Sequence, residues 1–243
     1  MSLHTTVRFD SCAAPPISRS VDTTSVTHLA VQAKLPQRSC QVKPELQAAD
    51  DGLGDGWRGL TFSGGGGKSI NVIDAHTLQT AWTMDMDLGV RPMAFNTNPD
   101  GSTKWIFVQV SGFNGFAVVD FAIRKEIKRI KNPDLPPGKS IVTAGSDPSH
   151  GMAVTSDGKT LVVCSRINNY LYSYSLPDLN DVGGAELGGK GAGWVTLAPD
   201  GKTAYVANPV TNDVSVVDVA SMKETSRIKV GFVPKRNVTV MLQ

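Results

Sequence analysis

The chain has 243 residues, of which 40% are hydrophobic and 19% are charged, and its formal net charge at pH 7 is +2. A chain of this length can bury a substantial core in one or two domains. The small net charge argues against a polyanion-binding role, and no stretch approaches the ~18 consecutive apolar residues of a membrane span. We therefore expect a soluble globular protein with no nucleic-acid partner and no transmembrane segment.

Residues 1–56 differ in composition from the rest of the chain. They are rich in Ser, Thr, Ala, Gln and Pro, and their apolar runs are short, as in residues 28–31. No continuous apolar stretch typical of a signal peptide occurs, so the sequence leaves the compartment open. The composition predicts a poorly structured segment. A degenerate extra repeat and an abnormal N-terminus of the reading frame are the alternatives.

From residue 57 onward one pattern repeats. A tight Asp-Gly turn is followed by a run of β-branched or aromatic residues, which is a hairpin signal. The turns are Asp100-Gly101, Asp157-Gly158 and Asp200-Gly201. The aspartates are 57 and 43 residues apart, and a period in the forties is typical of β-propeller blades.

A second phrase closes each repeat and supports the same period. It ends at Asp74, Asp120, Ser175 and Asp218, at intervals of 46, 55 and 43 residues. Both phrases show the same expansion in the same repeat. The extra residues include 132–139, where prolines and a glycine cannot continue a strand ladder, so we expect a loop inserted between two blades.

Each repeat predicts four short strands. An apolar inner strand is followed by the strand after the Asp-Gly turn, by an alternating third strand and by a charged fourth strand that fits an exposed edge. We expect an all-β propeller with about four visible blades. The C-terminal strand should complete the first blade, since ring closure removes free sheet edges. The expected blades are residues 57–88 with 236–242, 91–135, 148–188 and 191–231.

One repeat carries a motif that resembles a known family. Pro199–Asn208 is followed by Asn212–Asp218, and Tyr205-Val206-Ala207-Asn208 stands where the YVTN β-propeller repeat has its name-giving tetrad. The resemblance is strong in 191–235 and weaker toward the N-terminus. It implies WD40-like four-stranded blades of the kind found in cell-surface and periplasmic proteins of bacteria and archaea.

The same resemblance implies broader relatives, which include lactonase-like propellers and the propeller domains of haem d1 and amine dehydrogenase enzymes. Full-length members usually have about seven blades, within the general range of ~4–8. Four visible blades therefore indicate a partial or small propeller. An incomplete ring would favour self-association.

The segment Ser63–Ser69 looks at first like a phosphate-binding loop, because four glycines precede Lys68. The phosphate-loop pattern needs a further glycine where this chain has Phe62, and it needs a following helix where the pattern here predicts a strand. Glycines also supply positive φ angles in tight turns. We therefore expect a hairpin turn between the second and third strands of the first blade.

Basic and aromatic residues recur near the start of each inner strand. They are Arg91, His150, Trp194, Lys235 and Arg236. In a propeller such positions surround the mouth of the central channel, where ligands bind in other proteins of this architecture. A basic mouth suits an anionic group. The alternative is that these side chains are solvated and only cap the strand ends.

No catalytic constellation is evident. The four histidines and three cysteines show neither metal-ligand nor haem-attachment spacing, and no nucleophile motif such as Gly-x-Ser-x-Gly occurs. We expect no catalytic residue, metal or cofactor. The favoured function is a non-catalytic propeller that displays loops around its channel mouth for a protein or small-molecule ligand. The alternatives are a propeller enzyme, either a lactonase-like hydrolase or one related to electron-transfer dehydrogenases, and a structural module of a cell-surface assembly.

Overall fold

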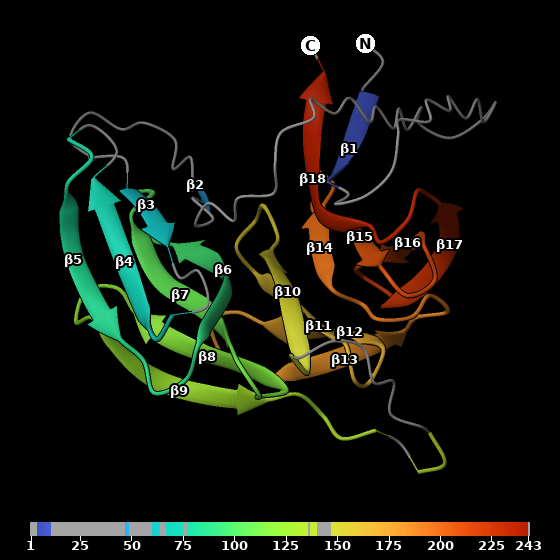
Figure 1. Ribbon diagram of the computed structural model, residues 1–243, viewed down its shortest axis with the longest axis horizontal. Coiled ribbons are helices and arrows are strands. Elements are labelled where there is room, and N and C mark those ends of the chain that lie inside the picture. Colours follow the sequence, from blue (N-terminus) through green and yellow to red (C-terminus); the bar gives the residue numbers. More distant parts are fainter. Residues whose placement is uncertain are drawn as a thin grey trace. The chain divides into compact units, whose positions relative to one another are not determined.

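The structure, a computed structural model, describes residues 4–10, 47–48, 60–63, 67–74, 77–135, 137–139 and 147–242. Every regular element within these ranges is a β-strand. The strands form four four-stranded sheets and one two-stranded sheet (Figure 1). The expected all-β class with blade-like antiparallel sheets is therefore confirmed.

The chain divides into two compact units, and the first unit holds two sheets. We call it the β2–β9 unit. Its sheets have the strand orders β2-β3-β4-β5 and β6-β7-β8-β9, so neighbours in sequence are neighbours in the sheet. The strands are β2 (Gln47–Ala48), β3 (Leu60–Ser63), β4 (Ser69–Asp74), β5 (Thr80–Asp85), β6 (Val90–Thr97), β7 (Thr103–Val110), β8 (Gly115–Asp120) and β9 (Lys125–Lys131).

The second unit, the β10–β18 unit, holds two further four-stranded sheets and the two-stranded sheet. The first sheet is made of β10 (Ser149–Val154), β11 (Thr160–Ser165), β12 (Tyr170–Ser175) and β13 (Asp181–Glu186). The second is made of β14 (Trp194–Leu197), β15 (Thr203–Asn208), β16 (Asp213–Asp218) and β17 (Lys223–Lys229). In the two-stranded sheet β1 (His4–Asp10) pairs with β18 (Lys235–Leu242).

The three Asp-Gly turns have one geometry. Each joins the first strand of its sheet to the second, and its aspartate Oδ1 accepts a hydrogen bond from the N–H two residues later, at 2.9–3.0 Å. The following glycines, Gly101, Gly158 and Gly201, have φ angles of 83°, 69° and 70°. Only glycine adopts this conformation without a steric cost, which explains why the dipeptide repeats.

The hairpin between the third and fourth strands also repeats, in all four sheets. The register shifts at one place in each hairpin, which is the mark of a β-bulge. Four residues after the third strand ends, the backbone is left-handed in every copy. These residues are Leu78, Arg124, Leu179 and Met222, with φ angles of 58°, 56°, 61° and 48°. The first sheet shares this geometry although its sequence lacks the Asp-Gly phrase.

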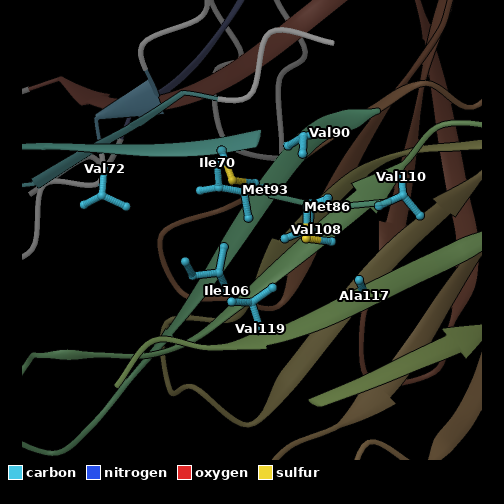
Figure 2. Packing of buried hydrophobic residues seen from close by; sticks show 10 residues of the cluster. All are labelled: Ile70, Val72, Met86, Val90, Met93, Ile106, Val108, Val110, Ala117 and Val119. Carbon is cyan, nitrogen blue, oxygen red and sulfur yellow. The ribbon is translucent and has the colours of Figure 1, made fainter. Parts of the chain in front are cut away.

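Each unit has its own apolar core. In the β2–β9 unit, buried side chains from both sheets pack as one cluster (Figure 2). Ile70, Val72, Ile106 and Val119 are among its fully buried members, and each such side chain contributes roughly 1.5–3 kcal/mol to folding. A corresponding cluster joins the two four-stranded sheets of the β10–β18 unit. The alternating third strands, predicted from sequence, supply members of both clusters.

The structure corrects the expected completion of the first blade by residues 236–242. The C-terminal strand β18 pairs with β1, from His4 opposite Leu242 to Arg8 opposite Val238. The first sheet takes β2 as its inner strand instead. Both partners come from residues 1–56, whose composition predicted little structure. Strand pairing uses backbone groups that every non-proline residue carries, so such short strands can form whatever the composition of the segment. The rest of residues 1–56 lies outside the described residues.

The glycine-rich segment before Ser69 connects two antiparallel strands, because β3 and β4 pair directly with Ser63 opposite Asn71. A strand, and not a helix, follows Lys68. Residues 64–66 lie outside the described residues. In the described ranges there is no helix with the length and apolar character needed to span a membrane.

Candidate functional site

Three of the five predicted site residues lie together in the β10–β18 unit. The rings of His150 and Trp194 have centroids 4.5 Å apart and are tilted by 57°. The Lys235 ammonium lies 5.8 Å from the centroid of the Trp194 ring. All three stand within the first two residues of their strands, β10, β14 and β18, and all three are half-buried. We call these residues the strand-start cluster.

A glycine allows β10 to lie close to β14 at this point. A Cβ atom on Gly151 would be 2.7 Å from Trp194 Cα and 2.7 Å from the Val195 nitrogen. Any side chain here would push the two backbones apart. His150 also contacts the turn that precedes Trp194, where its Nδ1 is 3.1 Å from the Gly193 carbonyl oxygen. Because a carbonyl only accepts, Nδ1 carries the hydrogen in this bond.

Polar contacts along β18 hold it beside β14 and β15. The Asn237 side-chain amide donates to the Tyr205 carbonyl at 2.6 Å, and the Thr239 N–H donates to Thr196 Oγ1 at 3.2 Å. These bonds position the start of β18, and with it Lys235, next to Trp194. Arg236 follows in the same strand with an exposed side chain and a φ of 51°.

The Lys235 ammonium gives the strand-start cluster a positive charge, and the pairing of β1 with β18 places Asp10 opposite Lys235. The acidic turns of the same sheets follow the opposite ends of the inner strands, with Asp157 after β10 and Asp200 after β14.

Arg91 belongs to the β2–β9 unit and has a different environment. Its Nε lies 3.1 Å from Asp147 Oδ2 and donates to Ser111 Oγ at 2.8 Å. The Asp147 side chain is only 6% exposed. A buried carboxylate thus balances the Arg91 charge, and the pair ties the start of β6 to its neighbours. This arrangement fits the alternative that Arg91 caps a strand.

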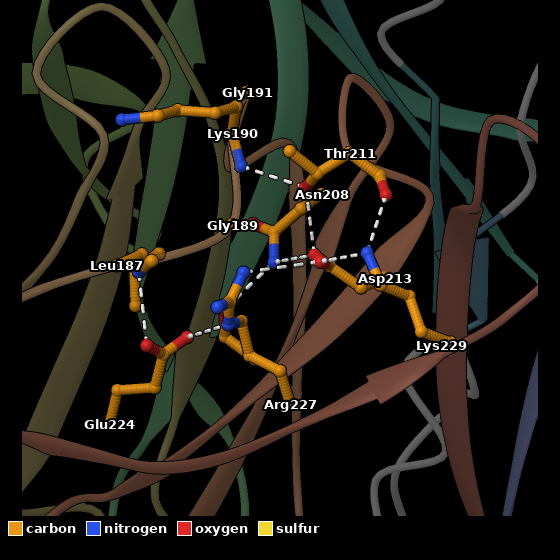
Figure 3. Close-up of polar contacts among 12 residues, drawn as sticks. Leu187, Gly189, Lys190, Gly191, Asn208, Thr211, Asp213, Glu224, Arg227 and Lys229 are labelled. Carbon is orange, nitrogen blue, oxygen red and sulfur yellow. Dashed lines mark hydrogen bonds and ion pairs between the residues drawn. The ribbon is translucent and has the colours of Figure 1, made fainter.

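The glycine-rich segment Gly188–Gly193 lies directly before Trp194 and forms hydrogen bonds with other residues of the protein (Figure 3). Four of its six N–H groups have acceptors, which are Glu224 Oε2, Thr211 Oγ1, Asn169 Oδ1 and the Ala207 carbonyl. Those N–H groups do not form an anion cradle. The segment instead fixes the backbone that carries Trp194.

Asn169 is the residue that sequence reasoning missed. Its side-chain amide donates to two carbonyls of the loop before Trp194, and its Oδ1 accepts from Gly191. A signal was present, because asparagine stands at one turn position in three sheets: Asn114, Asn169 and Asn212. In each case its backbone carbonyl accepts the N–H of the residue that follows the fourth strand, at 2.9–3.1 Å.

The Asp213 carboxylate is the centre of a second polar group, which Figure 3 also shows. This side chain is fully buried, and it accepts from Asn208 Nδ2 at 3.0 Å and Thr211 Oγ1 at 2.8 Å. Lys229 and Arg227 lie 3.2 Å and 3.4 Å away. Asn208 is the last residue of the Tyr205–Asn208 tetrad, so the tetrad has a structural role here: it joins β15 to β16.

The described part of the chain contains few groups that could catalyse a reaction. It contains no cluster of three or more His, Cys, Asp or Glu residues that could hold a metal ion. Cys164 is fully buried, and burial raises the pKa of its thiol far above the usual range. A thiol in that state is a poor nucleophile.

No family model matches this sequence, and neither does any curated protein. Among solved structures the chain is similar to Kuenenia stuttgartiensis hydrazine synthase, a protein that contains a β-propeller, with a TM-score of 0.55 and 23% sequence identity. The match covers 69% of this chain and 45% of that one. The chain thus spans less than half of the matched chain. At this identity the likeness shows the fold alone, and the fold is propeller-like and all-β.

Proposed function

We propose that this protein is a non-catalytic β-propeller of YVTN-like repeats that binds a small-molecule or protein ligand at the starts of its inner strands. The observation that supports this proposal is the strand-start cluster of His150, Trp194 and Lys235, which combines a partly exposed aromatic surface with a lysine ammonium. Rigid strands position these groups and loops flank them, which is a common arrangement for recognition. The repeat resemblance favours a periplasmic or cell-surface location.

Binding is favoured over catalysis because of the groups that surround the cluster. A hydrolase needs a nucleophile or an activated water with an acid–base partner within hydrogen-bond reach. The Gly193 carbonyl, which bonds to His150 Nδ1, orients the ring and takes up no proton. The activity named for hydrazine synthase belongs to that protein, since a likeness of 23% identity supports only a shared fold.

The proposal is tested by ligand screening against the full chain with a matched variant. Small molecules and short peptides are screened by the NMR shift of the Trp194 indole N–H, with Trp194→Phe used to assign the resonance. Trp105 provides the control, because Lys104 lies 4.4 Å over its ring in a comparable cation–aromatic pair. A ligand that shifts Trp194, spares Trp105 and loses affinity in His150→Ala supports the proposal. Ligands that bind with equal affinity when His150 and Lys235 are both replaced by Ala contradict it.

A further inference from the structure

The side-chain oxygen of Asn208 is a buried acceptor that no donor of the described residues reaches. Asn208 is fully buried at the end of β15, where it is the last residue of the Tyr205–Asn208 tetrad. Both protons of its amide nitrogen are used, because Nδ2 donates to Asp213 Oδ1 at 3.0 Å and to Ser215 Oγ at 2.7 Å. Buried polar atoms in proteins nearly always have a hydrogen-bond partner, so a further donor is expected at Asn208 Oδ1.

The orientation of this amide is determined by Asp213. An asparagine side chain can in principle be turned over so that its oxygen and nitrogen exchange places. The turned-over amide of Asn208 would direct its oxygen at the Asp213 carboxylate, which pairs with Lys229 and Arg227 and only accepts hydrogen bonds. Two oxygens would then face each other with no proton between them. The nitrogen of Asn208 therefore faces Asp213, and the oxygen is the atom that needs a donor.

The backbone of Gly189 lies directly against the Asn208 amide (Figure 3), since a Cβ atom on Gly189 would collide with Nδ2 and Cγ of Asn208. Gly189 is buried, and its N–H has no acceptor among the described residues, whereas its carbonyl accepts from Asn169. A buried acceptor and a buried donor are thus neighbours that do not bond to each other. One water molecule satisfies such a pair, because water donates and accepts at the same time.

We propose that Asn208 holds a buried water molecule, which donates to Asn208 Oδ1 and accepts the N–H of Gly189. Water fits better than an ion, because an amide oxygen repels anions and two cations already neutralise the adjacent Asp213 carboxylate. The inference is independent of any ligand at the strand-start cluster. It gives the last residue of the tetrad a second role: its nitrogen pairs with Asp213, and its oxygen, through water, fixes the segment that carries Trp194.

Two measurements on the full chain test for this water. In a crystal structure we expect ordered water about 2.6–3.0 Å from Asn208 Oδ1. In NMR spectra we expect a cross-peak between water and the Gly189 N–H, with the sign given by a water that stays bound for longer than the protein takes to tumble. The Gly191 N–H is the matched control, because it is buried in the same segment and donates to Asn169 Oδ1. It should give no such cross-peak.

Asn208→Leu is similar in size to the wild-type side chain and removes the acceptor. In this variant the water cross-peak at Gly189 should be lost, and the wild-type measurements decide the question if the variant does not fold. The inference is overturned if a protein donor or no ordered water lies at Asn208 Oδ1 in the crystal structure, or if the cross-peak persists in Asn208→Leu. Water at Oδ1 without a cross-peak at Gly189 overturns the link between the two residues.

Discussion

The side-chain amide of Asn169 donates to the carbonyl oxygen of Gly189 across 2.5 Å. The same nitrogen donates to Leu187, and the amide oxygen accepts from Gly191, so that one side chain bonds three residues of the loop before Trp194. Asn169 itself has a φ of 60°, a conformation that asparagine tolerates better than most residues. A turn of one blade thus holds the connection to the next.

Replacing Asn169 tests this link. Asn169→Ala removes three buried hydrogen bonds and places alanine at positive φ, so we expect the free energy of unfolding to fall by about 2–4 kcal/mol in urea denaturation. Asn169→Gly accepts the backbone conformation and should lose only the hydrogen-bond part. Asn180→Ala, on an exposed side chain, is the control. A change below about 0.5 kcal/mol in Asn169→Gly would show that water replaces these bonds.

Gly151 should be intolerant of any side chain. Gly151→Ala places a Cβ 2.7 Å from the Trp194 backbone, so β10 and β14 must separate. We expect a stability loss of about 1–3 kcal/mol, as for other overpacked sites, together with a changed environment of Trp194 in fluorescence. Gly231→Ala is the matched control, because a Cβ there meets nothing within 4 Å. Equal stabilities of the two variants would contradict the close approach of these strands.

Cys164 should resist thiol reagents in the folded protein. Its side chain is fully buried, and burial raises the pKa of the thiol, so the reactive thiolate is scarce at neutral pH. In a variant with Cys12 and Cys40 replaced by serine, we expect labelling by a disulfide reagent only on unfolding. The labelling rate should follow the opening of the β10–β18 core as urea is raised. Complete labelling within seconds in buffer would argue against the buried position.

The Asp157 turn should contribute to loss of stability in acid. Hydrogen bonds from Thr155 and Lys159 hold the pKa of Asp157 below its usual range. A lowered folded-state pKa gives stability that is present above the unfolded value of ~3.9 and is lost as pH falls through the folded value. We therefore expect the urea midpoint to fall as pH decreases below about 4.

Asp157→Asn keeps the turn geometry and removes the titrating group. Its urea midpoint should depend less on pH across that same acid range than the wild-type midpoint does. Asp178→Asn, at an exposed position, is the control and should follow the wild-type curve. A curve for Asp157→Asn that superimposes on the wild type would show that the hydrogen bonds at this turn do not favour the ionised carboxylate.

The elements that sequence predicted well are those with local causes. The Asp-Gly turns, the alternating third strands and the charged fourth strands depend on neighbours within about ten residues, and the structure has them. The pairing of β1 with β18 has no local cause, because residues 4–10 and 235–242 are more than two hundred residues apart in sequence. Backbone pairing of that kind requires no particular composition and no repeat, so the sequence contains no pattern that predicts it.

The candidate site likewise contains some contacts that the sequence predicted and others that it did not. His150, Trp194 and Lys235 share one position of the repeat, so counting positions indicated that they could meet. Asn169 was not predicted because asparagine is common in turns for purely local reasons. Its hydrogen-bond partners are 18–22 residues away, so no local pattern indicated them. The sequence also did not predict that Asp147 pairs with Arg91. The two residues are 56 positions apart, and no local pattern indicates that this carboxylate is buried next to Arg91.

The β1–β18 sheet has a consequence for the order of events during synthesis. Strand β1 leaves the ribosome before β18, which follows more than two hundred residues later. At ~5–20 residues per second, β1 waits roughly 10–50 s for its partner. The sheets of the β2–β9 unit lie between them in sequence and can form meanwhile. The nascent protein therefore carries an unpaired strand until β18 has been made, which is the interval in which a holding chaperone would be of most use.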